Sequence, residues 1–131
     1  MPPSLLFGPS QASQIVVAPA FGIESQPGKL AADVAGYIRH HLSDRVSAET
    51  LAEAFYLSRP YLSAKFKKET GVTLTDFILR EKTEEAKRLL RYSDKSAAAI
   101  GAYLGFSSHS HFIRVFKKYE GVTPNEYREK Q

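Results

Sequence analysis

Cysteine is absent from the 131 residues of the sequence. The chain therefore forms no disulfide and offers no thiol nucleophile, and a zinc site would lack its usual thiolate ligands. This composition fits a reducing cytoplasm. We predict neither a metal site nor a cofactor.

A long apolar stretch is also missing. The run IVVAPAFGI, which begins at Ile15, is broken by Pro19 and is far too short to cross a bilayer. The first residues include none of the basic side chains that open a secretory signal. The sequence therefore predicts no contact with a membrane.

Acidic residues are outnumbered by basic ones, because 18 lysines and arginines stand against 14 aspartates and glutamates and leave a net charge of +4. Residues 1–30 contain only Glu24 and Lys29 as charged residues, so the surplus lies downstream. A basic balance is compatible with a polyanionic partner such as nucleic acid, although many soluble proteins share it. A hydrophobic content of 43% is enough for a packed core.

The chain changes character near Leu30. Residues 1–29 are rich in proline, glycine, serine and glutamine, and we interpret them as a linker or the remnant of a preceding region. The remainder shows helical periodicity almost throughout, beginning with the amphipathic pattern of AADVAGYIRHHL. These patterns predict an all-α fold.

The segment 73–92 predicts a long linker helix. LTDFILREKTEEAKRLLRY is apolar at both ends, whereas REKTEE in its middle is almost wholly charged. A helix that buries both ends and exposes its middle joins two separate cores. A single helix crossing one continuous core is the alternative.

Two stretches of the sequence repeat each other. FKKETGVTLTDF begins at Phe66 and FKKYEGVTPNEY at Phe116, an offset of 50 residues, whereas the preceding helices pair Leu51 with Ile100, an offset of 49. The second copy therefore has one added residue at its turn. Two short helices joined by a tight turn form a helix-turn-helix unit, whose second helix can enter the major groove of DNA. We predict one such subdomain at 30–72 and another at 93–131.

The second helix of each copy has one apolar side and one polar side. Helical periodicity turns Leu62 and Phe66 inward in the first copy, and Phe112 and Phe116 in the second. The outward sides are small or polar at the helix start, which permits close approach to base edges, and basic at the end, which suits phosphates. The predicted base-reading residues are Arg59, Pro60, Ser63, Ala64, His109, Ser110, Ile113 and Arg114. The predicted phosphate contacts are Ser58, Lys67, Lys68, Ser108, Lys117 and Lys118.

The region from Val34 to Arg128 resembles the DNA-binding domain of the AraC/XylS family of bacterial transcription regulators. The resemblance rests on YLSAKFKKETGVT, on AKRLL at the end of the long helix, and on GFSSHSHFIRVFKKYEGVTPNEYR. It implies seven helices in two helix-turn-helix subdomains joined by the long helix. It also implies that the two recognition helices enter successive major grooves on one side of double-stranded DNA.

The chain departs from the family pattern at several positions. Ala64 stands where family members often carry arginine, and Lys82 and Thr83 stand where arginine and an apolar residue are usual. Gly101 replaces a small alanine. Glycine in a helix interior costs roughly 1 kcal/mol of helix stability relative to alanine, so we expect the first helix of the second subdomain to be less stable.

The two predicted recognition helices differ in their side chains. Pro60, Ser63 and Ala64 offer few long hydrogen-bonding groups. We therefore expect the first helix to read DNA by shape complementarity, by contact with thymine methyl groups and through water-mediated hydrogen bonds. Arg114 can make a bidentate contact to guanine, with His109 and Ser110 nearby. We therefore expect the two subdomains to contribute unequally to the recognition of DNA bases.

An enzyme is the first rival class. His40 and His41 are adjacent, and His109 and His111 are two apart, so neither pair shares a helix face as two metal ligands would. The carboxylates of Glu81, Glu84 and Glu85 fit a solvated helix surface, and no phosphate-binding glycine loop or nucleophile elbow occurs. Catalysis is not predicted.

A helical module that binds protein is the second rival, with Tyr56, Tyr61 and Tyr119 as candidate surface residues and RNA polymerase as a candidate partner. The commonest plan of the resembled family adds a sensor domain, for which residues 1–29 are too short. We therefore expect the chain to be the C-terminal part of a longer regulator acting at the cytoplasmic nucleoid. The alternative is a compact member of the family that acts without a ligand. A small-molecule effector is expected only if a sensor domain is missing from this chain.

Overall fold

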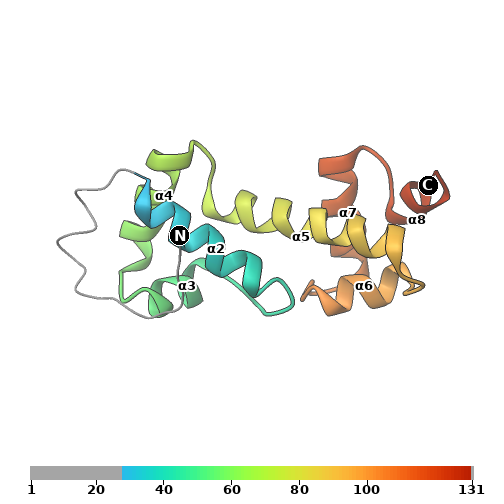
Figure 1. Cartoon of the computed structure of the whole chain (residues 1–131), viewed down its shortest axis with the longest axis horizontal. Coiled ribbons are helices and arrows are strands. Elements are labelled where there is room, and N and C mark those ends of the chain that lie inside the picture. The colour runs from blue at the N-terminus through green and yellow to red at the C-terminus, as the bar shows by residue number, and fades with distance from the viewer. Residues whose placement is uncertain (1–27, 131) are drawn as a thin grey trace.

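The computed structural model describes residues 28–130, and Figure 1 shows them as two helical units at opposite ends of one long helix. The first unit contains α2 (Lys29–His40), α3 (Ala48–Ala54) and α4 (Arg59–Thr70), and the long helix is α5 (Leu74–Tyr92). The second unit contains α6 (Ala97–Tyr103), α7 (His109–Glu120) and α8 (Pro124–Glu129). Within 28–130 there are seven helices and no strand, so the predicted fold class is confirmed. The expectation for residues 1–27 lies outside the described residues.

Hydroxyl side chains begin most of the helices. Each accepts a hydrogen bond from the backbone N–H three residues further on, which satisfies a donor that has no partner inside the helix. These caps are Ser47, Ser58, Thr73, Ser96, Ser108 and Thr123. The helix starts therefore follow from local sequence.

The two helix-turn-helix copies end in the same way. Gly71 after α4 and Gly121 after α7 both have φ of 83°, in the left-handed region that glycine adopts without strain. Their N–H groups donate to the carbonyls of Lys67 and Lys117, each at 2.8 Å. This geometry is a common helix C-terminus and turns the chain toward the next element in both copies.

The turns between the paired helices also match. Tyr56 and Gly105 occupy equivalent positions, with φ of 57° and 81°. The next residue of each turn donates back to the carbonyl five residues earlier, at 2.9 Å in the first copy and 3.1 Å in the second. The added residue is Ser107, which precedes the cap Ser108 and places its Oγ 3.2 Å from Nδ1 of His111. The inferred insertion at the second turn is confirmed.

The buried apolar residues form two clusters. The first joins α2, α3 and α4 to the start of α5, and its most enclosed members are Val34, Ile38, Leu51, Leu62 and Phe66. The second joins α6 and α7 to the end of α5, around Ala86, Ile100, Leu104, Phe112 and Phe116. Leu42, in the loop after α2, packs against both clusters. Each helix pair is therefore anchored in its own core.

The middle of α5 is not wholly solvated, and here the sequence prediction was wrong. Lys82 is only 5% exposed and Thr83 only 1%. The Thr83 hydroxyl donates to the carbonyl of Leu79 in its own helix at 2.8 Å. The Lys82 ammonium donates to the carbonyls of Leu42 at 2.6 Å and Asp44 at 3.1 Å, and to that of Leu104. Burial is tolerated because the three N–H donors of this ammonium meet three acceptors.

Gly101 lies where α6 and α7 approach each other closely. A Cβ atom at this position would stand 2.9 Å from Cγ and Cδ2 of Phe112, whose side chain is fully buried. The sequence interpretation counted Gly101 only as a weak point of helix propensity. The structure supplies the reason for glycine, since a side chain here would collide with a ring that has no room to move.

Gly101→Ala tests this contact. The gain in helix propensity is about 1 kcal/mol, whereas overpacking a filled core costs about 1 to 3 kcal/mol. We expect a net loss of stability of about 1 kcal/mol in urea unfolding followed by circular dichroism. Gly36→Ala is the matched control, because a Cβ there meets nothing within 4 Å and the substitution should stabilise. Stabilisation by both substitutions would contradict the collision.

The pH dependence of stability tests the burial of Lys82. Desolvation lowers the pKa of Lys82 to about 8 from its ordinary 10.5, and the nearby charge of Asp44 opposes this shift. Between these two values the unfolded chain binds more protons than the folded chain, so the unfolding free energy rises with pH. We expect the wild type to gain stability relative to Lys82→Met between pH 8 and pH 10. Parallel stability curves for the two proteins would contradict a depressed pKa.

Candidate nucleic-acid interface

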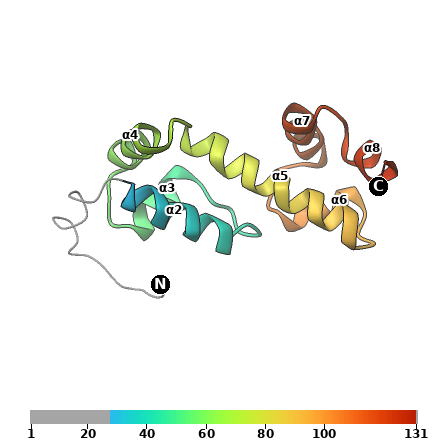
Figure 2. The same cartoon turned by 45° about the horizontal axis from the view of Figure 1, so that its top comes forward.

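The two predicted recognition helices lie on the same side of α5. In Figure 1, α4 and α7 both run from the level of α3 and α6 toward the top of the view, at opposite ends of α5. Figure 2 draws α4 beside the upper end of α5 and α7 above its second half, with α2, α3 and α6 lower in the view. The two helix-turn-helix units are therefore presented in the same orientation, one behind the other along the long helix.

The outward and inward sides of α4 and α7 are as the periodicity predicts. Leu62, Phe66, Phe112 and Phe116 have no exposed surface. All fourteen predicted DNA contacts remain accessible, because twelve are exposed and two, Ser63 and Ile113, are half-buried. Neither recognition helix has its polar side sealed against the protein.

The acidic residues of both recognition helices point toward other helices. Glu69 of α4 accepts a hydrogen bond from the backbone N–H of Ala31 at 3.0 Å and pairs with Lys65 at 3.5 Å. Glu120 of α7 pairs with Lys87 of α5 at 3.3 Å. The acidic residues of the two helices therefore do not cover their outward sides. Four lysines there form no ion pair within residues 28–130, namely Lys67, Lys68, Lys117 and Lys118.

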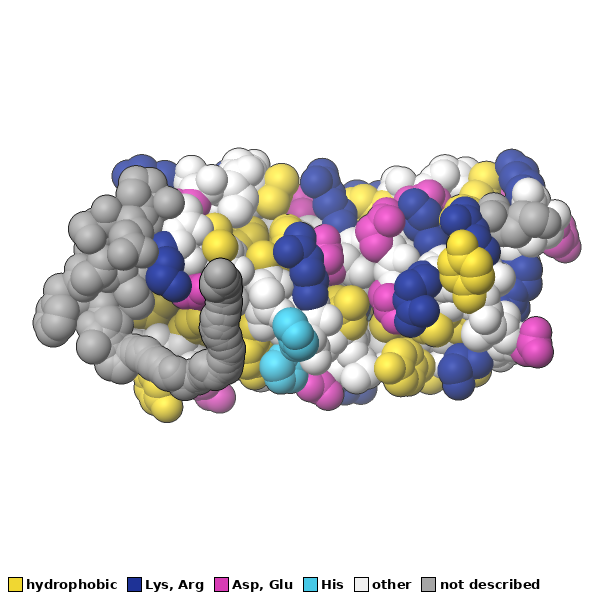
Figure 3. Space-filling model, in the orientation of Figure 1, with side chains coloured by type: hydrophobic (Ala, Val, Ile, Leu, Met, Phe, Trp, Pro, Cys, Tyr) yellow, Lys and Arg dark blue, Asp and Glu magenta, His cyan; other side chains and the backbone are white. Residues whose placement is uncertain are grey.

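One face of the molecule carries charges of both signs (Figure 3). Figure 3 shows the side that carries α2 and the front of α5, where lysines and arginines are interspersed with acidic side chains. Helices α2 and α5 carry the ion pairs of Arg39 with Glu81 at 2.9 Å and of Arg88 with Glu85 at 2.6 Å.

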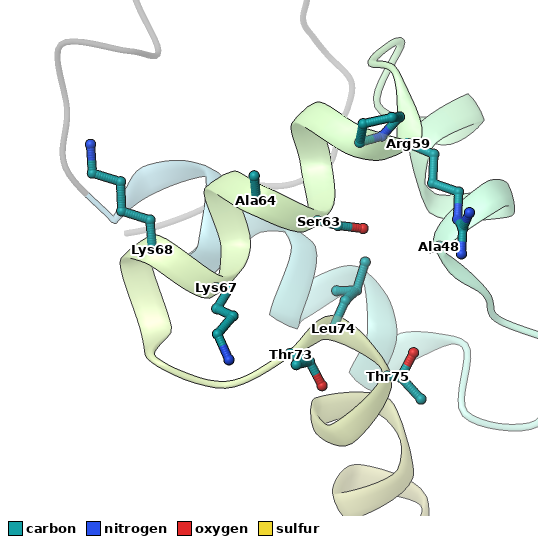
Figure 4. A pocket seen from close by; sticks show the side chains of 10 residues that line it. Ala48, Arg59, Ser63, Ala64, Lys67, Lys68, Thr73, Leu74 and Thr75 are labelled. Carbon is teal, nitrogen blue, oxygen red and sulfur yellow. The ribbon is translucent and has the colours of Figure 1, made fainter.

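An open hollow runs along the outward side of α4, and Figure 4 shows it from close by. Ser63 and Leu74 point into the hollow, while the Lys67 side chain extends toward Thr73 at the start of α5. Its lining residues are Ala48, Arg59, Pro60, Ser63, Ala64, Lys67, Lys68, Thr73, Leu74 and Thr75. The predicted reading face of α4 is therefore concave, with α3 and α5 as its walls.

Three lining residues of this hollow were missed by the sequence analysis. Ala48 belongs to α3, and Leu74 and Thr75 to the first turn of α5, so they join α4 only through tertiary packing. Thr73, the cap of α5, also lines the hollow. The repeated Gly-Val-Thr sequence was the available signal, since it turns the chain back and brings the start of the next helix beside the recognition helix.

The long cationic side chains on the two faces have different surroundings. Arg59 pairs with Glu49 of α3, with Nε and Oε2 3.3 Å apart and both side chains more than 60% exposed. Figure 4 shows this arginine directed toward α3, beside Ala48. Arg114 of α7 is exposed and forms no ion pair within the described part of the chain. An exposed ion pair is weak, so Arg59 can exchange Glu49 for another acceptor.

A hydrogen bond fastens the end of α7 to the start of α5. The Tyr119 hydroxyl donates to Oδ1 of Asp76 at 2.9 Å, and this bond lowers the pKa of the Asp76 carboxyl. The Arg80 guanidinium lies 5.9 Å from the centre of the Tyr119 ring. Tyr119 is half-buried and its hydroxyl is held by Asp76. Tyr56, in the turn between α3 and α4, is 88% exposed.

No group of three histidine, cysteine, aspartate or glutamate side chains in 28–130 could hold a metal ion. In the same range, no helix has the length and apolar character needed to span a membrane.

Comparison with known proteins places this geometry among helix-turn-helix proteins. A family model described as a helix-turn-helix domain matches residues 51–130. The regulatory protein PocR of Salmonella typhimurium is 42% identical over 93 residues, which represent 71% of this chain and 31% of PocR. The chain spans about a third of the length of the first curated relatives that it matches.

Solved structures show the same arrangement of helices. The C-terminal domain of AraT, a response regulator from Geobacillus stearothermophilus, superposes with a TM-score of 0.74 at 29% identity, covering 78% of this chain and 85% of that one. The DNA-binding domain of AdpA, a global transcriptional factor solved in complex with a target DNA, gives a TM-score of 0.72 at 29% identity. That match covers 76% of this chain and 90% of the AdpA domain.

Proposed function

Because the chain belongs to the AraC/XylS family of DNA-binding transcription regulators, we propose that α4 and α7 enter successive major grooves of one duplex. The observation that carries this proposal is the parallel exposure of two basic helix faces on one side of α5. Each face has small or polar residues at the helix start and a lysine pair at its end. This pattern suits base contacts at the helix start and phosphate contacts at its end.

The dimensions of α5 fit the repeat of DNA. Its 19 residues span about 28 Å at 1.5 Å per residue. The two recognition helices pack near its two ends, α4 before its first turn and α7 beside its second half (Figure 1). We propose that their separation matches one duplex turn of about 34 Å. Both helices then meet the same side of the duplex, since the major groove returns to that side after one turn.

The two helices read DNA unequally in this proposal. The hollow beside α4 is lined by short side chains at Pro60, Ser63 and Ala64, which favour fit, thymine-methyl contact and water. Arg114 of α7 makes a bidentate contact to guanine, flanked by His109, Ser110 and Ile113. Arg59 contributes to reading when it leaves Glu49.

The phosphate contacts come from both ends of each recognition helix. The cap hydroxyls of Ser58 and Ser108 already accept a backbone N–H, and each keeps its own proton to donate to a phosphate oxygen. The lysine pairs at 67–68 and 117–118 supply charge at the other end. These contacts fix register and provide most of the salt-dependent affinity.

The role of the whole regulator extends this proposal. PocR and the other curated relatives are longer than this chain, which fits a regulator whose remaining part senses a signal such as a small molecule. We place its action at the bacterial nucleoid, without catalysis of its own. RNA polymerase is the proposed protein partner, and the exposed Tyr56 is a candidate contact.

Selection of bound sequences from a random duplex pool tests the proposed function. We expect a site of two unlike half-sites whose centres lie about 10 to 10.5 base pairs apart. Binding to the selected site should weaken steeply with salt, because phosphate contacts release counterions. A protein-binding module that does not read DNA would enrich no sequence and show no such salt dependence.

Arg114→Ala tests the base-reading role of α7. We expect a loss of about 1 to 3 kcal/mol in binding free energy at the selected site, and a relaxed preference at one base pair. The measurement is fluorescence anisotropy against the selected site and its single-base variants.

Lys117→Ala is the control on the same helix. It should weaken binding to all sequences alike and reduce the salt slope by about one unit. If Arg114→Ala also weakened all sequences alike, Arg114 would be a phosphate contact and not a base reader.

A further inference from the structure

The two subdomains meet at a small polar contact in the middle of the molecule. Lys82 of α5 donates to Leu42 and Asp44, which lie in the loop after α2, and to Leu104, which ends α6. The same loop approaches the second turn directly, because a Cβ on Gly105 would stand 3.1 Å from the carbonyl oxygen of Asp44. One ammonium group thus holds a loop of the first subdomain against the turn that leads into α7.

The chemistry of this contact makes it directional. An ammonium has three N–H donors, and here three backbone carbonyls accept them, two from the first subdomain and one from the second. Apolar contacts such as those of Leu42 tolerate sliding, whereas hydrogen bonds to fixed carbonyls weaken steeply when their angles change. The contact therefore favours one relative orientation of the two subdomains.

Few other contacts could substitute for this one. The hydrogen bond from Tyr119 to Asp76 ties α7 to the start of α5, next to the first core, and the exposed pair of Arg39 and Glu81 ties α2 to α5. Neither bond joins the loop after α2 to the turn before α7. Each subdomain has its own apolar core, so each retains its fold when the contact is lost.

We propose that Lys82 is a positioning residue that fixes the separation and rotational phase of α4 and α7, and thereby selects DNA sites by the spacing of their half-sites. The inference rests on the proposed function, since it concerns how two recognition helices share one duplex. Joining two binding modules rigidly raises their effective concentration for correctly spaced sites and lowers it for others. Loosening the joint removes both effects while leaving each half-site contact intact.

Binding to duplexes of varied spacing tests the specificity. The probes are the selected site, the same site with one, two or five base pairs inserted between half-sites, and each half-site alone. For Lys82→Met we expect about tenfold weaker binding at the best spacing, a smaller penalty for insertion, and unchanged binding to single half-sites. Lys82→Arg keeps donors for both subdomains and should preserve the wild-type profile. Lys95→Met is the charge-matched control, because Lys95 is exposed and lies outside the contact.

Distance measurement without DNA separates this inference from the proposed function. The chain has no cysteine, so spin labels can be placed through Glu53→Cys on α3 and Ala102→Cys on α6, both exposed. Pulsed dipolar spectroscopy should give one narrow distance distribution for the wild-type background and for Lys82→Arg, and a broader one for Lys82→Met. If Lys82→Met does not fold, as judged by circular dichroism, Lys82→Gln replaces it and should broaden the distribution relative to Lys82→Arg.

The results of these two experiments distinguish a failure of the Lys82 role from a failure of the proposed function. An unchanged narrow distribution in the folded variant, or an unchanged spacing profile, overturns the role of Lys82. Equal loss at single half-sites and full sites also overturns it, because the residue would then support only the fold. A broadened distribution in a protein that selects no DNA supports the joint and refutes the proposed function instead.

Discussion

The structure depends on one constraint, which is that α4 and α7 each bury one side in a separate core while their opposite sides face the same way. Phe66 and Phe116 anchor the two helices through equivalent positions, and α5 carries both cores on one rigid rod. Glu69 and Glu120 are drawn into contacts with other helices, which leaves the outward sides basic. The sequence repeat therefore gives two similar basic surfaces, one on α4 and one on α7, which lie at different positions along α5 and face the same way.

The contact of Lys82 between the subdomains lowers stability but favours one relative orientation of the two subdomains. Burying the Lys82 ammonium costs free energy, and its lowered pKa reflects that cost. Well-packed apolar residues often stabilise a protein as much as a buried charge does, yet they specify a relative orientation less sharply. For a protein that meets two grooves of one duplex, orientation is the property that matters. The proposed positioning role of Lys82 would account for a charge buried in the middle of a helix between two cores.

Much of this architecture could be predicted from the sequence because it is local or periodic. Hydroxyl caps, Gly71 and Gly121 act within one turn of a helix, and the offset between Leu51 and Ile100 located the insertion that the structure places at Ser107. Burial of Lys82 was not predictable, because its acceptors are carbonyls 40, 38 and 22 residues away. The same holds for the contact of Gly101 with Phe112 and for the walls of the hollow beside α4. Composition shows charge along the chain, but only tertiary packing decides which charges remain free.

Hydroxyl-radical footprinting on the selected duplex tests most directly whether both recognition helices meet one side of the same DNA. The account predicts two protected patches per strand, about one helical turn apart, with both patches on one face of the duplex. A single protected patch, or patches on opposite faces, would contradict it, because α4 and α7 would then not engage the same duplex in the orientation that the structure gives them.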